Sequence, residues 1–498
     1  MGIVRRQGIQ SFILIFTGFI IGAVNILVLS PHILGQEEFG LTRVILDAQL
    51  VLASICSFGT IPIVNKFFPF YESHTKPEEN DLPYLSALFC TVGFILLIIA
   101  GFIFDEWVIR KLGGKSTLFT KENYFFIFPA TFFWLLFMWL EAFTWGLKKT
   151  VLPNFLKETL VRLITTVLIV LYGLHYISFH TFMWLFSLLY VIPCIILFRV
   201  LIRSGRWKFN MRISRLTKRL KPVLLKFMYP VFAAGSLNLL ARTADTFLLT
   251  GYNGLTDAAI FTVANYVVTT MDLPFRSIVA ISTPVLAESW KNKDMKNIYN
   301  VYSKSTVTLL MAGLLLFGII WLNLHNLEAF LPEKYKIASG LIFAMSITKL
   351  IDLGTGLNGH VLAYSNYRLV EFYSNLFFTV VSIPLNAILI KNYGLMGAAY
   401  GSMISLTSYN LVRFAYVWYK FRLQPFTHKN LILIAAGIGS ILAIWAIPRI
   451  GNLYADTFMR TVSFSGLFMG LCIWLKVSPD VNHVVWGNIV KYSRKIKK

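Results

Sequence analysis

The chain has little charge for its length and few cysteines. Only 14% of its 498 residues are Asp, Glu, Lys or Arg, whereas 56% are hydrophobic and the mean hydropathy is +0.66. Soluble domains carry charge on about a quarter of their residues, so the composition excludes an ordinary soluble fold. Because Cys56, Cys90, Cys194 and Cys472 lie within or beside apolar runs, they indicate small packing residues and argue against a disulfide framework.

Sequence signals for catalysis or metal binding are also scarce. The segment RKLGGKST, 110–117, ends like a phosphate-binding loop, but Ile109 stands where that pattern needs its first glycine. The eight histidines are scattered, and His175 and His180 are five residues apart and not four, so no metal site is expected. No Gly-x-Ser-x-Gly elbow occurs. We therefore predict neither an enzyme nor a resident cofactor.

Long apolar runs dominate the sequence, and each is long enough to cross a bilayer as a helix of about 20 residues. They predict an all-α polytopic membrane protein with fourteen transmembrane helices. The first run is too long for a signal peptide and lacks a small-residue cleavage site, so it is kept as a span. The predicted spans are, roughly, 9–30, 41–65, 83–104, 123–147, 152–174, 178–201, 224–250, 257–286, 302–323, 337–363, 369–390, 394–419, 430–449 and 457–477.

The net charge of +23 is distributed unevenly along the chain. Of the 46 Lys and Arg residues, 30 lie in segments that would share one side of the membrane with both termini. Because cytoplasmic loops are enriched in these residues, both termini are predicted to be cytoplasmic, and nucleic-acid binding is not indicated. The connection 105–121 is basic although it should face outward. Either its acidic neighbours Asp105, Glu106 and Glu122 balance it, or it binds anionic sugar chains.

The longest basic stretch, RSGRWKFNMRISRLTKRLKP at 203–222, separates the sixth span from the seventh. Within it, Arg212, Arg215 and Arg219 recur at helical spacing beside apolar residues. This pattern predicts an amphipathic helix on the anionic inner leaflet. A purely topological role for the stretch is the alternative.

The two halves of the chain are weakly alike, which is typical of transporters whose substrate site lies between repeats. The segment LSPHILGQEEFGLTRVILDAQLV after the first span compares with LLTGYNGLTDAAIFTVANYVVTT after the seventh. We therefore expect an N-lobe of six helices at 1–202 and a C-lobe of six at 223–421 around a central cavity. Two further helices and a basic tail follow at 422–498.

The segments ILGQEEFGLTRVI after the first helix and LPNFLKETLVRLITTVL in the fifth, together with this helix plan, carry a family resemblance. Over nearly its whole length the chain resembles the polysaccharide-export branch of the MOP (MATE-like) superfamily, the Wzx-type lipid-linked oligosaccharide flippases. The resemblance implies a V-shaped cavity between two lobes and alternating access. The cargo would be an undecaprenyl-pyrophosphate-linked glycan (O-antigen, capsule or exopolysaccharide), moved from the inner to the outer leaflet of the bacterial cytoplasmic membrane. Glycan polymerase and export machinery are the implied partners.

Ionisable residues inside the predicted spans are functional candidates, because they are costly unless they face a wet cavity or a partner. Four pairs lie three or four residues apart on one helix face and either neutralise each other in packing or serve transport. They are Arg43 with Asp47, Arg242 with Asp245, Asp272 with Arg276, and Lys349 with Asp352. In the second pair we expect Asp245 to hold Arg242 in place when the cargo is absent. Lys157 and Arg162 flank a single Glu158, and Arg413 has no local acid, although Arg413 could also extend to the inner surface. Such a local surplus of cations suits a pyrophosphate, since Arg binds phosphate oxygens through a planar fork.

The candidate residues fall into two groups by charge. Glu141 and Glu371 could carry a proton or help to bind Na⁺ as a coupling ion, although Glu141 could instead pair with Lys148 or a neighbouring helix. The candidate ligands of the anionic head are Arg43, Lys157, Arg162, Arg242, Arg276 and Lys349. The orienting or ion-coupling candidates are Asp47, Glu141, Glu158, Asp245, Asp272, Asp352 and Glu371.

Three segments predict broken helices: SFGTIPIVN (57–65), TTMDLPFRSI (269–278) and DLGTGLNGH (352–360). Their prolines and glycines free backbone groups that neighbours or cavity water must satisfy. These breaks either serve as hinges for lobe movement or are packing kinks. The hinge candidates are Pro62, Pro274, Gly354 and Gly356.

Four other functions are consistent with parts of the pattern. A membrane glycosyltransferase or an O-antigen polymerase would need a sizeable external loop, but the longest outward connection, 105–121, has about 17 residues. A MATE-type exporter of cationic molecules would need surplus carboxylates in its cavity. A lipid II flippase would have the same arrangement of helices and the same need for cationic residues to bind its pyrophosphate, so it is the nearest alternative.

Overall fold

The computed structural model of the chain describes residues 2–113 and 115–477, and within this part the regular elements are all helices. The predicted basic tail at 478–498 lies outside the described residues. The chain forms two compact units. Unit 1 comprises residues 1–263 together with 390–395, and unit 2 comprises 264–389 and 396–498.

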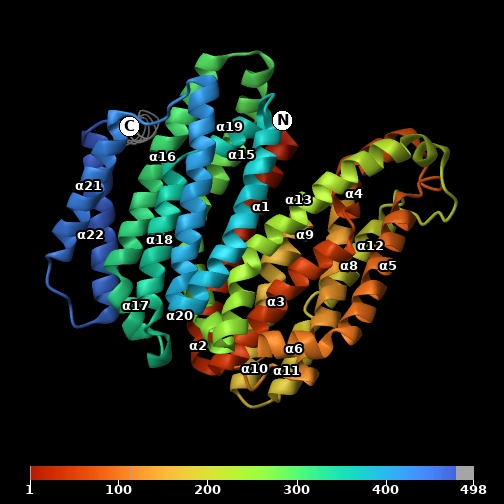
Figure 1. The fold of residues 1–498 in the computed structure, drawn as a ribbon, viewed down its shortest axis with the longest axis horizontal. Helices are drawn as coiled ribbons and strands as arrows, with labels where there is room; N and C mark the ends of the chain where they lie inside the picture. Colours follow the sequence, from red (N-terminus) through yellow and green to blue (C-terminus); the bar gives the residue numbers. More distant parts are fainter. Residues whose placement is uncertain (1, 114, 478–498) are drawn as a thin grey trace, which may run out of the picture. The chain divides into compact units, whose positions relative to one another are not determined.

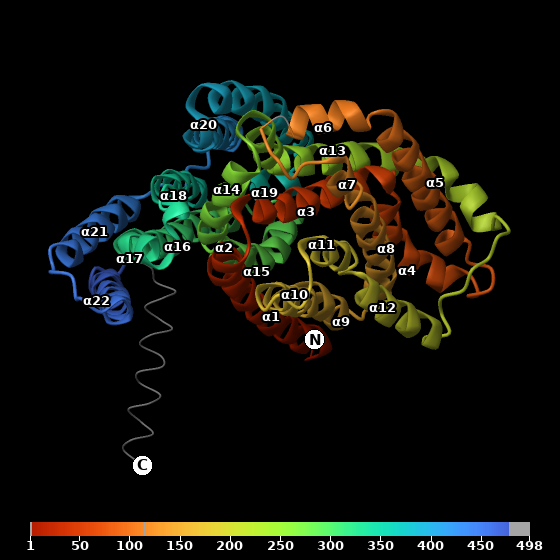
Figure 2. The same cartoon turned by 90° about the horizontal axis from the view of Figure 1, so that it is seen from below.

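Unit 1 begins with long apolar helices joined by short turns (Figures 1 and 2). Two of its segments, η1 and η2, are π-helical turns set into otherwise continuous α-helix. Its elements are α1 (Gly2–Ala23), η1 (Val24–Leu29), α2 (Ser30–Ile33), α3 (Gln36–Cys56), α4 (Thr60–His74), α5 (Leu82–Ile103), α6 (Asp105–Gly113), α7 (Lys121–Tyr124), α8 (Ile127–Gly146), α9 (Val151–Asn154), η2 (Phe155–Leu160), α10 (Val161–Gly173), α11 (Phe179–Ser187), α12 (Val191–Arg203), α13 (Arg215–Asn253) and the first part of α14 (Leu255–Thr269).

Unit 2 holds the remaining helices, of which α21 and α22 lie side by side as a hairpin in both views (Figures 1 and 2). In α20 a kink at Gly394 joins two helices end to end. Its elements are α15 (Asp272–Lys291), α16 (Met295–Leu322), α17 (Leu324–Phe330), the 3₁₀ turn η3 (Glu333–Tyr335), α18 (Ala338–Gly354), α19 (Asn358–Tyr364), α20 (Arg368–Phe421, apart from residues 390–395), α21 (His428–Trp445) and α22 (Leu453–Trp474).

In the described part of the chain, 11 helices are long and apolar enough to cross a membrane, or 12 if the bent pair α14 and α15 forms one span. The protein is therefore a multi-pass membrane protein. Two predicted spans are not counted separately. Residues 151–173 form one helical stretch but contain Lys157, Glu158 and Arg162, and α20 merges two predicted spans across its kink. The total of fourteen and the lobe boundaries stay predictions.

Aromatic and aliphatic side chains form the core of each unit. In unit 1, α8 packs against α3, α4 and α12, and the buried rings of Phe68 and Phe143 meet edge to face with centroids 4.9 Å apart. In unit 2, α16 packs against α15, α18, α21 and α22, where the buried Phe464 and Phe468 stack with centroids 5.8 Å apart. Interdigitation of this kind holds membrane helices together where lipid offers no hydrophobic driving force.

The structure corrects the prediction for the basic stretch 203–222. Residues 204–214 are turn and irregular chain, so Arg212 does not share a helix with Arg215 and Arg219, which lie in the first turns of α13. Ser214 caps that helix, and its hydroxyl donates to Asp81 Oδ1 at 2.9 Å. The polar residues at the start of α13 thus favour a fixed helix start over a free amphipathic helix.

The basic connection 105–121 has an internal acid partner. Lys121 Nζ lies 2.7 Å from Asp105 Oδ2, and the hydrogen bond from this ammonium holds the pKa of the Asp105 carboxyl below its usual range. The contact agrees with the interpretation that acidic neighbours balance this connection.

Candidate functional site

Four of the predicted residues come together in unit 1, on α8, η2 and the first turn of α10. We call Glu141, Lys157, Glu158 and Arg162 the unit-1 cluster. Arg162 Nη2 lies 2.9 Å from Glu158 Oε2, and Lys157 Nζ lies 3.7 Å from Glu141 Oε1. The prediction that Lys157 and Arg162 flank a single acid is therefore wrong in space, because Glu141 of another helix supplies a second carboxylate.

The π-helical turn η2 places this cluster. A π turn adds one residue to a helical turn, and such turns are frequent at functional sites. Lys157 and Glu158 lie within η2, and Arg162 follows in the next turn. At the same level of α1, Gly18 lies so close to the Glu158 carbonyl that a Cβ there would collide with it. The first span and η2 therefore touch backbone to backbone.

Asn25, which the sequence analysis missed, lies in the other π turn, η1, and connects it to this cluster. Its Nδ2 donates to the Arg162 carbonyl at 2.9 Å, and its Oδ1 accepts from the Thr166 hydroxyl at 2.7 Å. Asn25 is buried, so these bonds satisfy a costly polar group and fix α10 against η1. A lone polar residue in an apolar run is the signal that could have identified it.

The predicted pair on α3 is confirmed as an ion pair, since Arg43 Nη2 lies 3.2 Å from Asp47 Oδ1. The pair on α13 differs. Arg242 has an exposed side chain and makes no ion pair within the described residues, whereas Asp245 is buried. The expectation that Asp245 holds Arg242 in place is therefore not supported by a contact.

In unit 2, Lys349 replaces Arg276 as the partner of Asp272. Lys349 Nζ lies 2.5 Å from Asp272 Oδ1 and 3.0 Å from Asp352 Oδ2, so the predicted Asp272–Arg276 pair is wrong and the Lys349–Asp352 pair is confirmed. Asn410 Nδ2 donates to Asp352 Oδ1 at 2.9 Å. This unit-2 cluster, Asp272, Lys349, Asp352 and Asn410, links α15, α18 and α20. Arg276 is exposed and makes no ion pair in the part of the chain that the structure describes.

Arg413 is buried and forms an ion pair with Glu371, also on α20. Its guanidinium lies 3.8 Å from the centroid of the Tyr409 ring. Arg413 has no local acid, as predicted, but Glu371, distant in sequence, pairs with it, so the inference that Arg413 is a surplus cation is wrong. Its extension to the inner surface is also wrong, because the side chain is buried. Forty-two residues separate the partners, and the kink in α20 folds them together, which helical spacing does not reveal.

The three predicted helix breaks are confirmed. Chain turns separate α3 from α4, α14 from α15, and α18 from α19. Pro62 and Pro274 occupy the first turn of the helix after each break, where a missing N–H costs little. Gly354 ends α18, and Gly356 has a left-handed φ of +69°. Whether these residues act as hinges stays a prediction.

The fourteen singled-out intramembrane residues contain seven cations and seven acids, so their formal charges cancel. Their exposure differs from pair to pair. The Arg43 side chain is 28% exposed and its partner Asp47 4%, and Lys157 is 31% exposed against 9% for Glu141. In the unit-2 cluster Lys349, Asp272 and Asp352 are about equally exposed. Two of the three intramembrane ion pairs described in unit 1 thus present a guanidinium or an ammonium group above a buried carboxylate, and that group can bind an anion without breaking the pair. In the third pair Arg162 is 28% and Glu158 25% exposed. Among the described residues, no group of three His, Cys, Asp or Glu could hold a metal ion.

Two solved transporter folds are similar to this chain. The structure of the lipid II flippase MurJ in an inward closed conformation superimposes with a TM-score of 0.70 at 15% identity, covering 97% of this chain and 99% of that one. An inward-facing multidrug resistance MATE family transporter of the MOP superfamily gives a TM-score of 0.57 at 15% identity, covering 82% and 94%. At such identity the similarity concerns the fold.

Sequence relatives agree with the fold. An uncharacterized membrane protein of Methanocaldococcus jannaschii is 23% identical over 406 residues, which cover 77% of this chain and 91% of the relative. The family described as polysaccharide biosynthesis protein matches residues 4–290, more than half of the sequence. The chain therefore has the fold of the MOP superfamily and belongs to the polysaccharide biosynthesis protein family.

Proposed function

We propose that the chain is a flippase that moves a lipid-linked oligosaccharide from the inner to the outer leaflet by alternating access. The carrier would be a polyprenyl pyrophosphate such as undecaprenyl pyrophosphate. The observation that carries the proposal is the exposure of cationic groups above buried acids at Arg43 and Lys157. Arg242 and Arg276 add two exposed guanidinium groups without an ion pair in the described chain. A pyrophosphate offers these groups charge-assisted hydrogen bonds.

The charge pattern also favours this cargo over a cationic one. A carrier of cations needs accessible carboxylates, but in unit 1 Asp47 and Glu141 are nearly enclosed beneath their partners. The more exposed carboxylates Glu158, Asp272 and Asp352 are each paired with a cation. An anion needs only the exposed face of each pair. The membership in a polysaccharide biosynthesis family supports a glycan on the carrier lipid, with glycan polymerase and export machinery as partners.

The test uses the purified full chain in proteoliposomes that contain a labelled polyprenyl-pyrophosphate oligosaccharide, with outward movement followed by lectin binding. We expect Arg242→Ala and Arg276→Ala each to weaken cargo binding about ten- to a hundredfold, because a hydrogen bond to a charged group contributes roughly 1.5 to 3 kcal/mol. Lys336→Ala is the matched control, since Lys336 is an exposed cation paired with Glu333 at 3.4 Å. Unchanged binding in both arginine variants would remove them from the site.

Lipid II flipping is the second candidate, because the MurJ fold covers nearly the whole chain. Both cargoes carry a pyrophosphate, so the arginine variants do not separate them. The two cargoes are separated by comparing transport in vesicles that contain lipid II with transport in vesicles that contain the oligosaccharide lipid, which lacks the peptide. Transport of lipid II alone would favour the second candidate, and transport of a cationic dye in place of both would contradict an anionic cargo.

Ion coupling is the remaining part of the proposal. Glu141 Oε1 and Glu371 Oε2 are buried oxygens without a hydrogen-bond partner among the described residues. A carboxylate in that position is suited to take up H⁺ or to contribute to a Na⁺ site. We expect Glu141→Gln or Glu371→Gln to remove the dependence of flipping on an imposed H⁺ or Na⁺ gradient, with Glu333→Gln, an exposed acid, as control. Gradient dependence that persists in both variants would assign coupling elsewhere.

A further inference from the structure

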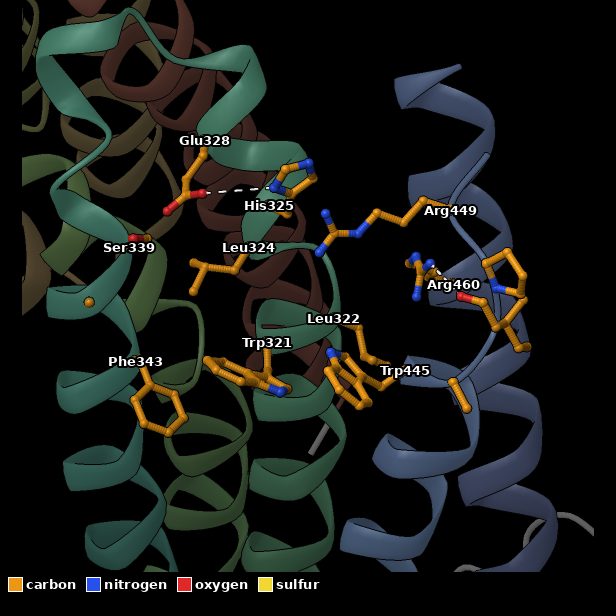
Figure 3. A pocket seen from close by; sticks show the side chains of 14 residues that line it. Trp321, Leu322, Leu324, His325, Glu328, Ser339, Phe343, Trp445, Arg449 and Arg460 are labelled. Atoms are coloured by element: carbon orange, nitrogen blue, oxygen red, sulfur yellow. Dashed lines mark hydrogen bonds and ion pairs between the residues drawn. The ribbon is translucent and has the colours of Figure 1, made fainter. Parts of the chain in front are cut away.

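A pocket of about 670 Å³ lies in unit 2, and none of the residues of the two charged clusters lines it. It forms where α16 and α21 end, and α17, the start of α18 and one turn of α22 complete it. Aromatic rings occupy one end and polar side chains the other (Figure 3). The aromatic end holds Trp321, Phe343 and Trp445, and the polar end holds His325, Glu328 and Arg449. A pocket divided in this way is suited to an amphiphile.

Arg449 is the free cation of this pocket. The neighbouring Arg460 is fully engaged, because it donates to Asp456 Oδ2 at 2.8 Å and to the carbonyls of Ile444 and Ile447 at 3.2 and 3.0 Å. Arg449 is exposed and has no hydrogen bond or ion pair in the described chain, and Figure 3 shows its guanidinium turned toward His325. Its planar fork of donors is open to a phosphate oxygen.

Glu328 supplies the opposite charge in the same pocket. Its carboxylate contacts His325 Nδ1 at 4.0 Å, which is too long for a hydrogen bond. In Figure 3 Glu328 and Arg449 stand on either side of His325. The pocket thus offers one cation and one carboxylate, and the complement of that pair is a zwitterion.

An apolar surface leads away from the aromatic end. Trp445 is 64% exposed, and the exposed apolar residues of α21 continue from it at intervals of three or four residues. This spacing places them on one helix face, a stripe about 21 Å long at 1.5 Å per residue. The stripe consists of Leu431, Ile434, Ile438, Leu442 and Trp445. An acyl chain can lie along it, with the headgroup in the pocket, since Trp is enriched at the headgroup level of membranes.

We propose that this pocket binds the phosphoethanolamine headgroup of a membrane phospholipid. The phosphate binds Arg449, the primary ammonium donates to Glu328, and the acyl chains pass Trp445 to the stripe on α21. Phosphatidylcholine has no N–H group to donate to Glu328, and phosphatidylglycerol has no cation. The pocket therefore discriminates among headgroups that share a phosphodiester.

Native mass spectrometry of the detergent-purified full chain, given an equal mixture of the three phospholipids, tests this proposal. We expect phosphatidylethanolamine to be retained about tenfold over each of the others, a difference of about 1.4 kcal/mol. Arg449→Ala and Glu328→Gln should each remove this preference. The matched controls Lys336→Ala and Glu333→Gln change the same charges at exposed positions near the same helix ends and should keep it.

Equal retention of the three lipids by the unaltered chain, or an unchanged preference in both pocket variants, would overturn the proposal.

A displacement experiment separates a lipid from a soluble occupant. Water-soluble phosphoethanolamine at millimolar concentration should not displace the lipid, because it cannot contact the stripe. Complete displacement would show that a soluble phosphate compound, and not a lipid, is the occupant. Elution of each variant as a monodisperse peak confirms that a lost preference is not lost folding.

Discussion

Arg460 and Asp456 on α22 are almost completely enclosed, with side chains 4% and 2% exposed. Asp456 also accepts from Asn326 Nδ2 at 2.8 Å and from the Ile450 amide at 3.0 Å. Together with the carbonyls that Arg460 binds, these contacts join α17, α21 and α22. Removing one member leaves the other charged and buried, which is far more costly than removing both.

We therefore expect Arg460→Leu to lower the free energy of unfolding by about 3 to 5 kcal/mol, the cost of breaking a buried pair. Adding Asp456→Leu to that variant should recover part of the loss. Arg449→Leu, eleven residues earlier and exposed, should change stability by no more than about 0.5 kcal/mol. Denaturant titration in detergent measures all three, and a single Arg460 variant as stable as the Arg449 control would refute the structural role.

Spacing along a helix revealed the residue pairs that are local and missed those that are not. Arg43 with Asp47 and Lys349 with Asp352 could be predicted because three- and four-residue separations bring side chains together. Asp272 pairs with Lys349 of another helix and not with Arg276, four residues further along α15. The choice depends on how α15 packs in unit 2, and no spacing rule contains that information.

At the scale of elements, apolar run length predicted most spans, and proline and glycine predicted where helices break. The π turns η1 and η2 were not predictable, because a π turn is set by contacts such as those of Asn25 with α10 and not by residue type. The irregular chain at 204–214 was missed for a related reason. Its basic spacing suits a helix, but the cap at Ser214 starts α13 after it.

The break between α18 and α19 gives a matched pair of glycines. At Gly356 a side chain would adopt a left-handed φ of +69°, and its Cβ would overlap Thr306 of α16. At Gly354, inside α18, a Cβ would meet only the end of Leu310 at an ordinary 3.6 Å. The same methyl group should therefore destabilise the protein at Gly356 and be tolerated at Gly354.

We expect Gly356→Ala to destabilise the protein by more than about 1 kcal/mol, the cost of the left-handed conformation alone. Gly354→Ala should be neutral or stabilise by up to about 1 kcal/mol, since Ala is the better helix former. Thermal unfolding in detergent compares them. If flexibility at this break drives transport, Gly354→Ala will also slow flipping without loss of stability; equal destabilisation by both changes would contradict the local geometry.

At the scale of the whole molecule, composition sufficed to predict an all-helical membrane protein, and the resemblance to flippases agrees with the family match and the fold. Charge counting was less successful. The surplus of cations read from neighbours in sequence disappears once Glu141 and Glu371 are paired with Lys157 and Arg413. What remains is a difference in exposure at two pairs of unit 1, where Arg43 and Lys157 are accessible above Asp47 and Glu141. Exposure is a property of packing that the sequence does not display.

The orientation of the chain in the membrane decides the direction of any flipping and the leaflet that the aromatic pocket faces. The distribution of Lys and Arg predicts that 203–222 is cytoplasmic, so the turn between α21 and α22 should be external.

Cysteine labelling tests this orientation. All four native cysteines are buried, so they should react little with a maleimide in the folded protein. Met211→Cys and Gly451→Cys replace exposed residues, and nothing lies within 4 Å of a Cβ at 451. In intact cells a membrane-impermeant maleimide should label the Gly451 variant at once and the Met211 variant only after permeabilisation. Because an odd number of spans separates the two positions in the predicted plan, labelling of both from outside would contradict the span count, and labelling of the Met211 variant alone would reverse the orientation.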